Sequence, residues 1–149
     1  MNRTEQIIAV DPGKVTGWAV LGIEGLYTGG EGSLHDILAS IETLLIEGDK
    51  PIIVCEDFIF TTATAKKSRQ TWSTEGIGVL RYLAARYQVS FIIQGPAAAK
   101  RFAIDDKLKA MGWYHPTPGG HRNDAARHLL LYADGVERID RRRLFNALD

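Results

Sequence analysis

The stretch IIAVDPGKVTGWAV, residues 7–20, decides the fold of this chain. An apolar run ends at Asp11, Pro12 and Gly13 make a turn, and a second apolar run starts at Val15. A near-continuous apolar run is typical of a strand buried on both faces. A carboxylate held at the end of such a strand, beside a glycine turn, is well placed to bind a cation. An ordinary Asp-Pro-Gly turn is the alternative.

The rest of the chain alternates strand and helix patterns. Five segments have the composition of strands, and the first three of them suggest an antiparallel meander: residues 6–10, 15–21, 26–32, 51–56 and 89–93. Six segments have helical patterns. The first starts at a Ser33 cap and ends at Gly48, and the second runs from about residue 74 to 87. The others start at Pro96, run from an Asp105 cap to 111 and from 121 to 133, and include the basic tail. This order predicts one α/β domain, residues 1–149. Its mixed sheet has three antiparallel plus two parallel strands and is flanked by helices.

Composition places the chain among globular proteins. It has 149 residues, of which 45% are hydrophobic and 24% charged. No apolar run approaches the length of a membrane helix, and the first residues have no signal-peptide pattern. Cys55 is the single cysteine, so we expect no intrachain disulfide and a buried structural thiol. A cytoplasmic protein without membrane contact fits these features.

The formal net charge of zero conceals an uneven distribution. Residues 1–60 carry three Lys and Arg against ten acids, whereas residues 61–149 carry fifteen against eight. Such a split favours a polyanionic partner for the basic part. The alternative is a folded chain in which the two sets of charges intermix.

Three further positions could complete a metal site with the first carboxylate. Glu56 ends the strand over residues 51–56, and neighbouring strands lie about 5 Å apart, so Asp11 and Glu56 could reach one metal ion. His121 and Asp124 are three residues apart and share a helix face. Oxygen-rich ligands of this kind suit Mg²⁺ or Mn²⁺. Alternatively, each is an unremarkable strand-end charge, helix-terminal acid or capping histidine.

These stretches resemble the motifs of the RuvC family of Holliday junction resolvases, within the RNase H-like nuclease superfamily. DPGKVTG (11–17) resembles the first motif and IIVCEDFIF (52–60) the second. HRNDAA (121–126) resembles the last motif, in its variant with a histidine three residues before the aspartate. Residues 94–100 resemble the family's P-x-x-x-K segment, and residues 105–107 its later A-D-K stretch. Many members carry D-A-A-D in the last motif, where this chain has Arg127.

The resemblance implies two-metal hydrolysis of a DNA phosphodiester that leaves a 5′-phosphate. Asp11 would bridge two Mg²⁺ or Mn²⁺ ions, and Glu56, Asp124 and His121 would complete their coordination. Lys100 would act with them in catalysis, by neutralising phosphate charge.

The resemblance also implies a four-way junction or other branched DNA as partner. It further implies a homodimer formed through the apolar face of the helix over residues 74–87, which carries Ile77, Leu80, Leu83 and Ala84. We expect the following residues to contact DNA: Lys14, Phe60, Lys66, Lys67, Arg69, Lys100, Arg101 and Lys107. Phe60 is a candidate wedge at the crossing, where stacking on a base contributes about 1–3 kcal/mol. Phe58 and Trp72 are core residues or DNA contacts. The run Arg141–Arg143 either binds a distal arm or forms a solvated helix face.

Three other functions stay open. A YqgF-like RNase would share the first motif and cut RNA. A non-catalytic junction-binding module would keep the basic surface without needing His121 and Asp124. An actin-like sugar kinase opens with a similar turn but needs two such domains. The short chain and its basic tail resemble a phage-type member, which would act in the host cytoplasm.

Overall fold

A computed structural model describes residues 5–59, 61, 71–116 and 118–146 of the chain. Its strands are β1 (Ile7–Asp11), β2 (Val15–Leu21), β3 (Tyr27–Ser33), β4 (Ile52–Glu56) and β5 (Phe91–Gln94). Its helices are α1 (Leu34–Ile46), α3 (Trp72–Tyr87), α4 (Pro96–Phe102), α5 (Asp105–Met111), α6 (His121–Gly135) and α7 (Arg141–Asn146). No helix in this described part is long and apolar enough to cross a lipid bilayer.

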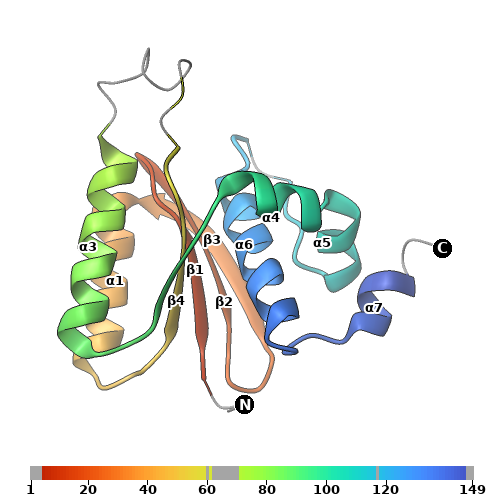
Figure 1. The fold of residues 1–149 in the computed structure, drawn as a ribbon, viewed down its shortest axis with the longest axis horizontal. Helices are drawn as coiled ribbons and strands as arrows, with labels where there is room; N and C mark the ends of the chain where they lie inside the picture. The colour runs from red at the N-terminus through yellow and green to blue at the C-terminus, as the bar shows by residue number, and fades with distance from the viewer. Residues whose placement is uncertain (1–4, 60, 62–70, 117, 147–149) are drawn as a thin grey trace.

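The strands form one mixed sheet in the order β3-β2-β1-β4-β5. The first three strands pair antiparallel, while β4 runs parallel to β1 and β5 parallel to β4. This confirms the predicted sheet of three antiparallel plus two parallel strands. Helices α1 and α3 cover one face, and α6 covers the other together with α4 and α5 (Figure 1).

Residues of β1 alternate between two hydrophobic clusters, which explains why this strand is apolar throughout. Ile7 and Ala9 pack into the cluster under α6, whereas Ile8 and Val10 pack into the cluster under α1 and α3. Each is at most 2% exposed. Since burying a large aliphatic side chain contributes about 1.5–3 kcal/mol, this two-sided burial fixes the register of the central strand.

Helix α1 begins and ends as the sequence predicts. The Ser33 side chain accepts a hydrogen bond from the Asp36 backbone amide at 3.2 Å, which satisfies one of the unpaired amides of the first turn. Leu38 and Ile41 lie on the buried stripe that faces the sheet. Gly48 follows the helix with a φ of 96°, a conformation that favours glycine.

One expectation about a charged residue in the C-terminal half is corrected by the structure. Asp105 is not the cap of α5: Ile104 holds that position, and the Asp105 carboxylate lies 2.6 Å from Arg127. Within the arginine run, Arg141 pairs with Asp134 at 2.9 Å and Arg143 donates to a carbonyl at the end of α5. These two arginines therefore attach α7 to its neighbours.

Candidate active site

Asp11 and Glu56 end two neighbouring parallel strands side by side. Val10 lies opposite Cys55 in the β1–β4 register, so the next residue of each strand carries a carboxylate. Alternation along each strand turns both side chains toward the face covered by α6. The two carboxyl groups interact electrostatically, and each side chain is only 14% exposed. The packing of the sheet therefore forces two acids together at its carboxyl edge.

The turn after Asp11 is held rigid from inside. The Thr16 side chain is fully buried, donates to the Gly13 carbonyl at 2.8 Å and accepts from the Gly13 amide at 3.3 Å. Pro12 is buried against α3, where a Cβ on Gly76 would lie 2.7 Å from the proline ring. The motif residues around Asp11 thus fix the position of its carboxylate.

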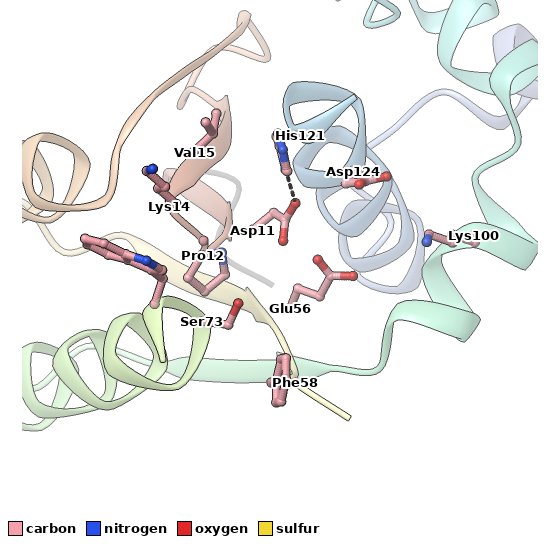
Figure 2. A pocket seen from close by; sticks show the side chains of 12 residues that line it. Asp11, Pro12, Lys14, Val15, Glu56, Phe58, Ser73, Lys100, His121 and Asp124 are labelled. Atoms are coloured by element: carbon pink, nitrogen blue, oxygen red, sulfur yellow. Dashed lines mark ion pairs between the residues drawn. The ribbon is translucent and has the colours of Figure 1, made fainter. Parts of the chain in front are cut away.

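Helix α6 reaches the sheet because β2 has no side chain where the two meet. A Cβ on Gly17 would collide with the carbonyl of His121, the first residue of α6. This close approach places His121 Nδ1 3.5 Å from Asp11 Oδ2 (Figure 2). Asp124 follows one turn later on the same face of the helix, as its three-residue spacing predicts.

The four candidate ligands line one open cleft of about 450 Å³. Figure 2 shows Asp11 and Glu56 on the strand side, His121 and Asp124 on α6, and Lys100 across from them. The cleft is lined by Asp11, Pro12, Gly13, Lys14, Val15, Glu56, Phe58, Trp72, Ser73, Lys100, His121 and Asp124. Phe58 and Trp72 also pack against the cluster under α1 and α3, so both are part core and part cleft wall.

Burial and neighbouring charge set the protonation of the two central acids. Burial first, and then the hydrogen bond and charge of Glu56, raise the pKa of Asp11 far above its usual range. Burial also opposes ionisation of Glu56, yet hydrogen bonds with His128 and Asp11 hold its pKa below its usual range. The pair therefore keeps one proton on Asp11 and a negative charge on Glu56. Burial and the charge of Glu56 also raise the pKa of Asp124.

The side chains of the four candidate ligands suit a divalent cation, although in this structure they contact one another and other protein groups. Among the described residues, no three His, Cys, Asp and Glu side chains are already arranged around one point. Asp11 faces His121 and Glu56, while Asp124 Oδ1 lies 3.6 Å from Arg127 Nε. Two buried carboxylates that share a proton gain most from a cation that replaces it. Carboxylate oxygens with one imidazole suit Mg²⁺ or Mn²⁺.

Three further polar residues adjoin the candidate ligands and were not predicted as part of the site. His128 lies behind Glu56, Gln94 lies behind His128, and Arg127 bridges Asp124 to Asp105. Two signals were available: residue 128 is seven positions after His121, on the same helix face, and Gln94 ends the strand beside Glu56. The length of β5 and its pairing with β4 could not be derived from the sequence.

The predicted DNA contacts divide into three groups. Lys14 and Lys100 line the cleft. Arg101 is exposed on α4, and the Lys107 ammonium lies 4.1 Å from the ring centre of Phe102 and packs beside Phe145, so neither lines the cleft. The other four lie outside the described residues: Phe60, Lys66, Lys67 and Arg69.

Comparison with known proteins identifies the fold. No protein-family model and no curated protein sequence matches the chain. A structure of Thermus thermophilus RuvC in complex with a Holliday junction substrate matches with a TM-score of 0.62 and 14% identity, over 90% of this chain and 97% of that one. A second Thermus thermophilus RuvC structure matches with a TM-score of 0.60 and 18% identity, over 89% and 97%. The chain has the RNase H-like fold. Its arrangement of elements is that of RuvC.

Proposed function

We propose that this protein is a divalent-metal-dependent endonuclease that cleaves Holliday junctions or other branched DNA and leaves 5′-phosphate ends. One observation carries the proposal: Asp11, Glu56, His121 and Asp124 converge with Lys100 on one cleft at the carboxyl edge of a RuvC-like sheet. In α/β sheets, ligand sites form beyond the carboxyl ends of the strands. Paired carboxylates beside a lysine match the needs of phosphodiester hydrolysis.

Each residue of the cleft has a role that follows from its place. Asp11, at the centre, would hold the cations together with Glu56 and Asp124, which flank it. Bound Mg²⁺ or Mn²⁺ supplies an activated water and neutralises charge on the leaving 3′ oxygen. His121, whose side chain is 38% exposed, is accessible enough to bind a cation or orient the attacking water. Lys100 and Lys14 would hold the phosphate by charge.

The proposed substrate requires two cuts on opposed strands, which a two-fold dimer would supply by symmetry. The apolar face of α3 that we expected to form this contact is buried in the core, where Leu80 is 0% exposed and Leu83 4%. The outer face of α3 is available instead, because it exposes Val79 (40%) and Tyr82 (64%) to solvent. We therefore propose that α3 forms the dimer contact and that residues 1–149 act as one nuclease domain.

Cleavage of matched substrates tests the proposal. The wild-type protein and Asp11→Asn are incubated with Mg²⁺ and a four-way junction, a flap, linear duplex DNA, single-stranded RNA and an RNA–DNA hybrid. We expect nicks in the branched DNA by the wild type and none by Asp11→Asn, which keeps the shape of the site but cannot ionise to bind a cation.

Each other result selects a different function. Preference for RNA would favour a YqgF-like RNase and reject the DNA assignment. Tight junction binding by both proteins without any cleavage would favour a non-catalytic junction-binding module. Equal cleavage by the wild type and Asp11→Asn would reject the proposed site.

A further inference from the structure

Glu56 is held from behind by two residues that do not line the cleft. His128 Nε2 lies 3.4 Å from Glu56 Oε1, and His128 Nδ1 lies 2.8 Å from Gln94 Oε1. Gln94 stands directly opposite Glu56 in the β4–β5 register, so both side chains face α6. The three groups form a continuous polar chain from β5 through α6 to the carboxylate.

Gln94, His128 and the Glu56 carboxylate lie in an otherwise apolar part of the molecule. His128 is 1% exposed and sits on α6 among the fully buried Ala125, Leu129 and Leu130. Burying an imidazole there is costly unless both ring nitrogens find partners. Glu56 Oε1 lies 3.4 Å from one nitrogen as an ion-pair partner, and the Gln94 amide can serve the other with its oxygen or its nitrogen. Both partners sit at the ends of neighbouring strands, so the sheet itself fixes the ring.

Position and burial decide what kind of role His128 can have. At 1% exposure it cannot touch a phosphodiester or an attacking water in the cleft. Its contact is with Oε1 of Glu56, which leaves the other carboxylate oxygen for the cleft. A carboxylate with one oxygen fixed loses rotational freedom, so less entropy is lost when it binds a cation.

On the basis of the proposed metal-dependent function, we propose that His128, supported by Gln94, is a positioning residue that orients Glu56 for cation binding. Partners of this kind behind a metal ligand typically contribute 10-fold to 100-fold in metal affinity. Among the candidate ligands, His128 contacts Glu56, whereas Asp11 is held by the turn and Asp124 by Arg127.

Mn²⁺ titration of the full-length protein tests this role without relying on cleavage. His128→Leu keeps the bulk and removes both hydrogen bonds, and we expect it to weaken Mn²⁺ binding about 10-fold or more. His128→Gln restores an N–H near the position of Nε2, so it should recover most of the affinity. Gln94→Leu keeps the imidazole but frees it to turn, and should give a smaller loss. Leu129→Val, which perturbs the same helix away from Glu56, should bind like the wild type.

Melting curves establish that each variant is folded before titration. A folded His128→Leu that binds Mn²⁺ like the wild type would overturn the inference and leave the nuclease proposal intact. Equal losses in His128→Leu and Leu129→Val would also overturn it, because core disturbance alone would then suffice. If His128→Leu does not fold, Gln94→Leu decides: unchanged affinity overturns the role, and weaker binding supports it. A wild type that binds no Mn²⁺ and cuts no DNA would reject the proposed function itself.

Discussion

The buried carboxyl groups of Asp11 and Glu56 lie side by side at the ends of two parallel strands. The pKa of Asp11 is raised and that of Glu56 is lowered, which favours one proton on the pair over two charges. Two ionised carboxylates at this separation, each 14% exposed, would repel strongly. The folded chain therefore holds a proton where the proposed site would hold a cation. The first two predictions follow from this proton.

Asp11→Asn should stabilise the protein when divalent metal is absent. The pKa of Asp11 is raised in the folded state, so its stabilising proton is fully bound below about pH 4. That stability is lost as pH rises from the unfolded pKa toward the folded one. An amide needs no proton, so the variant should be more stable than the wild type at pH 8 and should lose this advantage toward pH 4. Thermal melting of the variant and the wild type in EDTA at pH 4 and pH 8 measures this difference in stability. The control is Asp49→Asn, because Asp49 is exposed. A Tm difference between the variant and the wild type that is the same at pH 4 and pH 8 would contradict the raised pKa of Asp11.

Mn²⁺ should bind more tightly as pH rises. A cation that binds Asp11 must displace the proton, whose pKa is raised by burial and by Glu56. Release of one proton increases affinity by up to about tenfold per pH unit below the pKa of Asp11. Titration calorimetry at pH 6, 7 and 8, in buffers of different ionisation enthalpy, counts the proton directly. A flat affinity with no proton release would show that Asp11 is already ionised.

Gly17→Ala should damage the site more than the fold. The added methyl group would meet the His121 carbonyl and push the first turn of α6 away from β2. Such overpacking costs about 1–3 kcal/mol, and it separates His121 and Asp124 from the strand acids. Junction cleavage and Mn²⁺ affinity should both fall while the protein stays folded. The matched control is Gly135→Ala at the end of α6, where a Cβ meets open space; it should retain activity and stability.

Arg127→Gln should strengthen cation binding at the site. Arg127 Nε lies 3.6 Å from Asp124 Oδ1, so a fixed positive charge competes there with any metal ion. Its removal should raise Mn²⁺ affinity a few-fold, and should lower stability by about 1 kcal/mol because Asp105 and the Ala103 carbonyl lose their partner. Titration and melting measure the two effects. Weaker Mn²⁺ binding would mean that Arg127 orients Asp124 more than it repels the ion.

Lys14→Ala and Lys100→Ala should each weaken junction binding in a salt-dependent way. Both residues line the cleft, and each phosphate contact adds about one unit to the slope of log affinity against log salt. Binding is measured by fluorescence anisotropy at several KCl concentrations, in Ca²⁺ to prevent cleavage. Lys50→Ala is the control, because Lys50 caps the Tyr87 carbonyl at the other end of β4. A slope like that of the wild type would remove either lysine from the DNA surface.

The sequence predicted the mixed sheet chiefly because the pattern of its first strand fits a central position. The run before Asp11 is apolar at every position, which only a central strand covered on both faces can bury. Ser33 and Gly48 marked the ends of α1 through capping chemistry that is local to the chain. Strand and helix ends still shifted by one or two residues, as between the expected 89–93 and the observed Phe91–Gln94.

Partners across the fold were harder to predict, because they depend on register and helix rotation. His128 was not recognised because it stands in a helix of apolar residues, where only the position of Glu56 beneath it gives it a function. Arg127 was seen as a departure from the family motif, but its ion pair with Asp105 follows from how α5 sits on α6. Likewise, the bonds of Arg141 and Arg143 follow from the docking of α7.

Because Gly17 and His121 meet through backbone atoms, the distance across the site is set by main chain rather than by side chains. The distance from β2 to α6 is limited there by backbone atoms, whatever apolar residues fill the two clusters behind. The interior can therefore change its composition extensively while the acids keep their spacing. A distance that is set by backbone atoms is compatible with a fold that is shared with RuvC at 14% identity.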